Sequence, residues 1–138
     1  LLFGGGICLA RAFVASGLSA QVGDALTTVA ALPVFAMMLL LALAVTFLTE
    51  ATSNTATTAL LMPVLAAVAL AVEIDPLWLM VPAAMSASCA FMLPVATAPN
   101  AVVFGSGELP IRRMVREGFA LNLIGSLLIA TVAWVLLT

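Results

Sequence analysis

Residues 49–58 read TEATSNTATT, and this polar stretch separates two strongly apolar segments at 33–47 and 59–72. Each segment has about 15 residues, or about 22 Å at the helical rise, which is shorter than the ~30 Å hydrocarbon core of a bilayer. A non-helical backbone at membrane depth needs cover from protein or from a water-filled cavity. We therefore predict a re-entrant helical hairpin over residues 32–72, with its tip near 49–57.

The composition of the whole chain supports a membrane protein. Of the 138 residues, 65% are hydrophobic and 7% are charged, and the formal net charge is −2. A soluble domain has about 25% charged residues. This composition excludes a soluble globular domain, a disordered chain and a nucleic-acid binder, which would need a basic face. We predict an all-α polytopic membrane protein that lies in the lipid bilayer, because a transmembrane barrel would show short alternating strands.

The two ends of the chain also contain apolar runs. Residues 1–31 begin with an apolar run and continue with apolar positions at helical spacing, which predicts a first membrane helix and an amphipathic connecting helix. Residues 110–138 predict a final transmembrane helix, with Trp134 near its interfacial end. Because the chain starts within an apolar run, we expect it to be a fragment cut within a helix.

Residues 76–107 form an apolar run that is too long for one crossing and contains Pro94 and Pro99. Pro99 lacks a backbone donor and disfavours helix at the residue before it. We therefore predict a discontinuous transmembrane helix with a break near 95–100, which restarts at about Asn100.

The basic residues indicate the orientation of these segments. Arg112, Arg113 and Arg116 form the only basic cluster, which predicts a cytoplasmic position for it. The acidic turn at 73–75 would then lie outside, and the hairpin would enter from the outer side. We predict a multi-pass protein of the cell (inner) membrane.

Two interruptions at membrane depth indicate a transport site. Broken helices present positive N-terminal ends to anions and freed carbonyl groups to small cations. Asn54 and Asn100 are predicted to stand where helix resumes after each break. No Arg or Lys lies near either break, so an anion would be held by helix ends, by Asn and Thr side chains and by bound cations. Hydroxyl and carbonyl oxygens are the ligands of hard cations, which favours sodium.

Glu50 is the one acidic residue within the polar tip. An intramembrane carboxylate is a functional candidate, and it could carry a proton, ligate a cation or remain solvated. We favour a structural hydrogen-bonding role, because a single carboxylate is a poor proton relay.

These segments resemble the divalent anion:sodium symporter family, which carries a Ser-Asn-Thr signature at a hairpin tip in each of two inverted repeats. The signature occurs here once, at 53–55. Residues 89–101 (CAFMLPVATAPNA) and 104–107 (FGSG) are similar to the broken helix of the family's second repeat, and similarity extends to 121–125 in the last helix. The resemblance implies one half of an inverted-repeat elevator transporter, and a homodimer when complete.

The resemblance also implies roles for individual residues. Many relatives have Pro at the position of Ala98, and this departure leaves the identity of the substrate open. The implied substrate-binding residues are Ser53, Asn54, Thr55, Thr97 and Ala98, and the implied sodium ligands are Thr49, Thr52, Asn54 and the backbone carbonyl of Ala96.

The function implied is sodium-coupled secondary transport of divalent anions, with C4-dicarboxylates such as succinate as the favoured substrate and citrate and sulfate left open. Na⁺ would be the coupling ion. Because the signature occurs once, we expect this chain to be the C-terminal part of a transporter whose N-terminal half is missing here.

Two other interpretations remain. One is a different permease of the wider ion-transporter group, for arsenite or for Na⁺/H⁺ exchange, and the other is an inactive membrane fragment or subunit. An enzyme has no support, because the sequence contains no nucleophile–base pair, metal-ligand cluster or cofactor motif.

Overall fold

The computed structural model describes Cys8 and residues 11–12, 14–17 and 32–137. Most of the first membrane helix and of the connecting helix predicted at 1–31 therefore lies outside the described residues. Every regular element of the described chain is an α-helix, which confirms the all-helical fold class. The helices are α3 (Val34–Thr49), α4 (Asn54–Ala71), α5 (Leu77–Ser86), α6 (Ala98–Gly105) and α7 (Ile111–Leu137).

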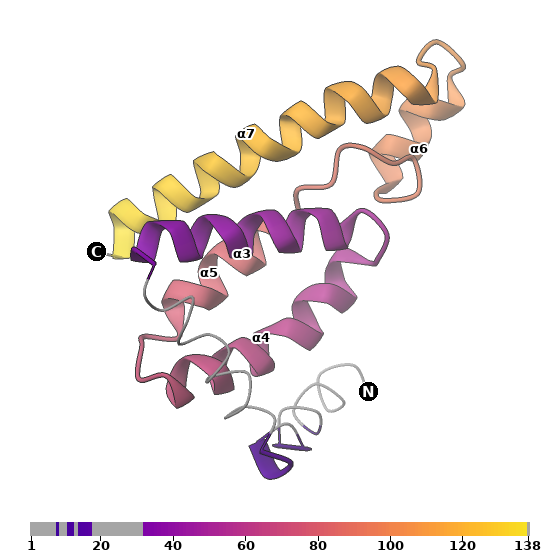
Figure 1. Cartoon of the computed structure of the whole chain (residues 1–138). Coiled ribbons are helices and arrows are strands. Elements are labelled where there is room, and N and C mark those ends of the chain that lie inside the picture. The colour runs from indigo at the N-terminus through magenta and orange to yellow at the C-terminus, as the bar shows by residue number, and fades with distance from the viewer. Residues whose placement is uncertain (1–7, 9–10, 13, 18–31, 138) are drawn as a thin grey trace.

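The longest helix, α7, runs along one side of the molecule with α3 against it, while α4 diverges from both (Figure 1). α3 packs mainly on α7 and α5, and α4 packs mainly on α5. In the described part of the chain, α4 and α7 have the length and hydropathy of candidate membrane spans. α4 has 18 residues, or about 27 Å, and is thus longer than the apolar flank seen in the sequence.

The turn between α3 and α4 is the polar stretch that separates the two apolar segments. α3 ends at Thr49 and α4 begins at Asn54. Ser53 has an extended backbone, and its Oγ accepts a hydrogen bond from Ala56 N at 3.5 Å. Ser53 therefore caps α4, and Asn54 is the first helical residue, which leaves the Asn54 side chain available for other contacts.

The acidic turn after α4 is formed by local capping. Glu73 has a φ of 57°, the left-handed conformation that ends many helices. Ile74 N donates back to Ala69 O at 3.0 Å, and Asp75 Oδ1 accepts from Leu77 N at 2.9 Å. One carboxylate thus stabilises the start of α5 directly after the end of α4.

The break in the second apolar run is longer than predicted. The helix ends at Ser86 and resumes at Ala98, so the break predicted near 95–100 begins earlier, at residue 87. The N–H groups of residues 91–93 donate to the Glu50 carboxylate at 2.7–2.9 Å. Bonds from a distant side chain therefore replace the i to i−4 bonds that a continued helix would make.

Asn100 does not hold the position predicted for it. Thr97 is the N-cap of α6, and its Oγ1 accepts from Asn100 N at 3.3 Å. The Asn100 side chain instead donates to the carbonyl oxygens of Ala90 and Leu93, at 2.9 and 3.0 Å. The Asn100 side chain thus stabilises the non-helical segment, and Asn100 is not the first residue of the helix that follows.

Small side chains occupy the crossings of α3, α5 and α7. Ala130 and Ala133 of α7 pack against Met38, while Ala83 of α5 and its C-cap residue Ala87 pack against Val45. Small residues let helix backbones approach closely. Such close packing favours helix association in a bilayer, where lipid is as apolar as the helix surfaces and the hydrophobic effect gives no driving force. A buried hydrogen bond of 3.1 Å between Ser126 Oγ and Thr46 Oγ1 joins α7 to α3.

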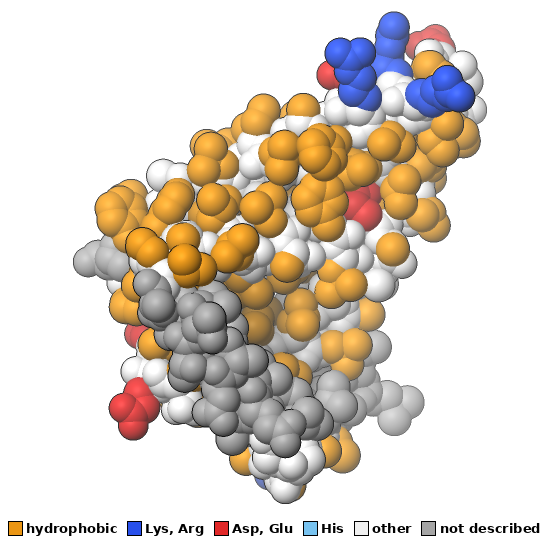
Figure 2. Space-filling view, in the orientation of Figure 1, with side chains coloured by type: hydrophobic (Ala, Val, Ile, Leu, Met, Phe, Trp, Pro, Cys, Tyr) orange, Lys and Arg blue, Asp and Glu red, His pale blue; other side chains and the backbone are white. Residues whose placement is uncertain are grey.

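The outer face of α7 is apolar, and large hydrophobic side chains cover it along most of its length (Figure 2). The basic side chains of α7 gather at its end opposite the C-terminus, where Arg112, Arg113 and Arg116 are exposed. An apolar shaft with charges confined to one end is the surface expected of a helix that crosses a bilayer.

At Gly118, α7 approaches the non-helical segment closely. A Cβ at Gly118 would overlap the carbonyl oxygen of Phe91 and lie 2.6 Å from the Cα of Met92. Both neighbours are backbone atoms, so they cannot move away as a flexible side chain would. Only glycine permits this contact between α7 and residues 91–92.

We expect Gly118→Ala to lower the free energy of unfolding by about 1–3 kcal/mol, because the added methyl overpacks a rigid contact. The matched control is Gly125→Ala on the same helix, where a Cβ meets nothing within 4 Å. This control should be neutral or slightly stabilising, since alanine favours helix by up to about 1 kcal/mol over glycine. Thermal unfolding of the purified protein in detergent measures both, and equal melting temperatures would contradict the packing argument.

Candidate functional site

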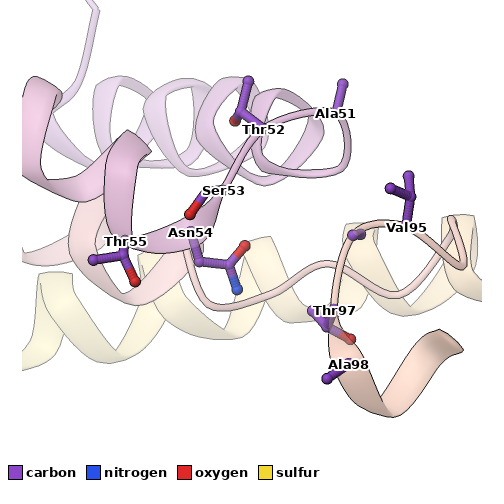
Figure 3. Close-up of a pocket in the computed structure, with 9 residues that line it drawn as sticks. Ala51, Thr52, Ser53, Asn54, Thr55, Val95, Thr97 and Ala98 are labelled. Carbon is purple, nitrogen blue, oxygen red and sulfur yellow. The ribbon is translucent and has the colours of Figure 1, made fainter. Parts of the chain in front are cut away.

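The turn between α3 and α4 and the end of the non-helical segment before α6 form two walls of one cavity (Figure 3). The cavity has a volume of about 470 Å³. Five of its nine lining residues come from the hairpin turn and the start of α4, and four come from the segment that leads into α6. The lining residues are Ala51, Thr52, Ser53, Asn54, Thr55, Val95, Ala96, Thr97 and Ala98.

The buried side chain of Thr49 positions the side chain of Asn54. Thr49 is fully buried, and its Oγ1 lies 2.6 Å from Asn54 Oδ1 and 3.0 Å from Ala87 O. The hydroxyl group has one proton for these two acceptors, so three oxygen atoms converge where the hairpin meets the end of α5. Thr49 therefore does not line the cavity, but its hydroxyl group bonds to Asn54, which does.

Thr52 is held by bonds within the hairpin. Its Oγ1 donates to Leu48 O at 2.9 Å and lies 2.6 Å from Thr57 Oγ1. Because the Thr52 proton is used for Leu48, the Thr57 hydroxyl donates to Thr52. These bonds connect the last turn of α3 to the first turn of α4 and fix the conformation of the tip.

The second wall is a helix start of the same kind. Thr97 has an extended backbone and caps α6, and Ala98 is the first helical residue. Both α4 and α6 therefore begin at the cavity, with a hydroxyl-bearing N-cap at Ser53 and at Thr97. The N-terminal end of a helix carries a partial positive charge and free N–H groups, which attract anions.

The lining carries no charged side chain. It consists of Thr and Ser hydroxyl groups, one amide, backbone groups and small apolar side chains. Such a surface supplies oxygen ligands for a hard cation and N–H donors for an anion. Among the described residues, no group of three or more His, Cys, Asp or Glu side chains could hold a metal ion.

Glu50 lies beside the cavity but does not line it. Its side chain is 4% exposed. Oε1 accepts hydrogen bonds from Phe91 N at 2.7 Å, Met92 N at 2.9 Å and Asn122 Nδ2 at 2.7 Å, and Oε2 accepts from Leu93 N at 2.9 Å. Of the roles considered from the sequence, these bonds support the structural one.

The structure brings together most of the residues that the sequence singled out. Seven of the eight predicted site residues line the cavity, and the eighth, Thr49, contacts Asn54 from outside the lining. Sequence reasoning did not include Ala51 and Val95, which carry no polar side chain. It also missed Asn122, although an isolated amide within an apolar helix is a signal of a buried polar contact.

Comparison with known proteins places the chain in a family. The family model described as "Sodium:sulfate symporter transmembrane region" matches residues 1–138. The sodium-dependent dicarboxylate transporter SdcS of Staphylococcus saprophyticus is 46% identical over 136 residues, which cover 99% of this chain and 26% of that protein. Solute carrier family 13 member 2 is 50% identical in Mus musculus and 48% identical in Homo sapiens, over 94% of this chain and 22% of each relative.

The chain thus spans about a quarter of the length of these relatives. They are transporters by family rather than enzymes, which supports the prediction of a non-enzymatic protein. The Ser-Asn-Thr signature and the interrupted helix are the two features that line the cavity. Because the family model matches residues 1–138, the chain belongs to the divalent anion:sodium symporter family.

Proposed function

We propose that this chain forms part of a sodium-coupled symporter of divalent anions, and that C4-dicarboxylates such as succinate are its substrates. The single observation that carries the proposal is the uncharged cavity between two helix starts, in a chain of this family. The name of the relative SdcS specifies sodium and dicarboxylate. Citrate and sulfate are the competing substrates that transport assays must separate from succinate.

The substrate anion is proposed to bind at the N-terminal ends of α4 and α6. Ser53, Asn54 and Thr55 contribute from the first wall, and Thr97 and Ala98 from the second. The lining contains no Arg or Lys, so helix ends, hydroxyl groups and the Asn54 amide carry the recognition. Partial charges of this size do not neutralise a dianion, and co-bound cations supply the remaining positive charge.

Sodium is proposed to bind to oxygen atoms at the tip and in the break. Thr52, Asn54 and the backbone carbonyl of Ala96 belong to the lining, and Thr49 contributes its Oγ1 beside Asn54 Oδ1 at 2.6 Å. A cation shared by the two walls would stabilise the arrangement that the anion requires. Such a difference in affinity between arrangements couples the two ligands, and the coupling is reciprocal.

The remainder of the transport machinery is proposed to lie in further chain. We infer that an N-terminal half supplies a second hairpin and the other part of the site, related to this half as an inverted repeat. We further infer that the complete protein is a multi-pass homodimer of the cell (inner) membrane, in which α3 and α4 form a re-entrant hairpin. In such a protein, the two walls would move with the substrate as an elevator against a dimeric scaffold.

The competing function, Na⁺/H⁺ or arsenite exchange, has less support from the geometry. A proton exchanger needs a carboxylate that can release and regain a proton during transport. Glu50 is the one acidic residue at the cavity edge, and all of its bonds are to N–H donors.

We expect Asn54→Ala in the complete transporter to raise the sodium concentration for half-maximal succinate uptake by about tenfold or more, because a ligand to a charged group is lost. The measurement is initial uptake of labelled succinate against sodium in proteoliposomes. Thr131→Ala is the matched control, since it removes an exposed hydroxyl group on α7 outside the cavity. Unchanged sodium affinity and rate in Asn54→Ala would remove Asn54 from the site.

We expect Thr97→Val to raise the KM for succinate about fivefold, since it removes the cap of α6 and a hydroxyl group of the lining. Thr97→Ser keeps the hydroxyl group and should retain a KM close to that of the unmodified protein. The same uptake assay at saturating sodium measures both variants. Equal KM values for the Thr97→Val and Thr97→Ser proteins would argue against a role for the start of α6 in substrate binding.

Residues 1–138 alone should show no sodium-dependent succinate uptake, because the proposed site needs a second half. Reconstituted chain in proteoliposomes with an imposed sodium gradient provides the measurement, and the complete transporter provides the positive control. Uptake by the chain alone would refute the need for further chain. A complete transporter that carries protons or arsenite without any dependence on a dianion would support the competing function instead.

A further inference from the structure

Glu50 is a buried carboxylate that the proposed binding steps do not use. It directly precedes the first wall of the cavity, and its hydrogen bonds reach the segment that leads into the second wall. We propose that Glu50 is a positioning residue, which holds the two cavity walls and α7 as one unit and binds neither the substrate nor sodium. This inference rests on the proposed function for its consequence in transport, and on the contacts below for its structural content.

The hydrogen bonds of Glu50 match a carboxylate that only accepts. Three successive peptide N–H groups, those of Phe91, Met92 and Leu93, donate to it, together with the amide of Asn122. Four donors use both carboxylate oxygens, and an ionised carboxylate offers acceptors alone. A glutamine of the same shape would direct its own NH₂ group at one or more of these donors.

These bonds connect the first wall to the segment that leads into the second wall. Within the described part of the chain, the hydrogen bonds that join the 50–53 turn to residues 91–93 all end on Glu50. The bond from Thr49 to Ala87 connects the hairpin to the end of α5 but does not reach the second wall. Without Glu50, residues 91–93 would lose their hydrogen bonds to the hairpin turn.

α7 is the third partner of this connection. Asn122 is fully buried, donates to Glu50 at 2.7 Å and accepts from Phe91 N at 3.3 Å through its Oδ1. One turn earlier, Gly118 admits the backbone of residues 91–92 against the helix. The non-helical segment is therefore held on one side by the hairpin and on the other by α7.

The consequence for transport is mechanical coupling between the walls. If the hairpin turn and the segment before α6 move as one unit, a change that a bound cation causes in one wall is transmitted to the other wall, where the anion binds. Glu50 would then set how strongly sodium favours substrate binding without touching either ligand. A residue that served stability alone would leave this coupling unchanged in the folded fraction of the protein.

The test compares Glu50→Gln with Glu108→Gln in the complete transporter. Glu108 is an exposed carboxylate outside the cavity, so its substitution is a matched control. The readout is the ratio of succinate dissociation constants without and with saturating sodium, measured on monodisperse protein in detergent. We expect Glu50→Gln to reduce this ratio by about tenfold or more, because bonds to a charged acceptor are lost. A folded Glu50→Gln protein with an unchanged ratio overturns the proposal.

A second variant covers the case in which Glu50→Gln does not fold. Asn122→Ala removes one of the four donors and leaves the carboxylate in place. Its readout is the rate of thiol labelling at Cys89, which is half-buried beside the held segment, in a transporter whose other cysteines are replaced. We expect faster labelling in Asn122→Ala than in Leu121→Ala, an exposed neighbour on the same helix. Equal labelling rates overturn the proposal.

The two readouts separate this inference from the proposed function. Absence of sodium-dependent succinate binding in the unmodified transporter would refute the proposed function. Cys89 labelling would still decide whether the hydrogen bonds of Glu50 and Asn122 hold the non-helical segment. Normal sodium-dependent binding with no effect of either substitution would refute the positioning role alone.

Discussion

The bonds that end on the Glu50 carboxylate are the interaction on which the rest of the structure depends. A backbone that leaves helical geometry inside a protein must find other partners for its N–H groups. Here three consecutive N–H groups find them on one side chain of the hairpin turn. This interaction allows the chain to stay unwound between α5 and α6, and so allows α6 to begin at the cavity.

The second constraint is the scarcity of charge at the cavity. Two helix starts and several hydroxyl groups face a space of about 470 Å³ that contains no basic side chain. Helix ends carry only partial charges, so a dianion at this place needs mobile cations as partners. In the proposed function, the dependence on sodium follows from the absence of Arg and Lys from the cavity lining.

Small residues on α7 let this helix pack closely against α3 and against the non-helical segment. Alanine, serine and glycine occupy the contacts of α7 with α3 and with the non-helical segment, and Ser126 and Thr46 bond across one of them. Close backbone approach replaces the hydrophobic driving force that a soluble core would use. Most of the larger apolar side chains of α7 lie on its outer face (Figure 2).

The sequence by itself determined the membrane class and the all-helical fold, because composition reflects the solvent that surrounds the chain. Its local motifs determined the family and the two segments that meet at the cavity, because they mark where helices end. It predicted a break near 95–100, whereas α5 ends at Ser86, and it placed Asn100 where Thr97 caps the helix. Only the tertiary structure decided these points. The partners of residues 91–93 lie more than 40 positions earlier in the chain, and Gly118 and Asn122 approach from α7, so no local pattern contains the bonds that keep the segment unwound.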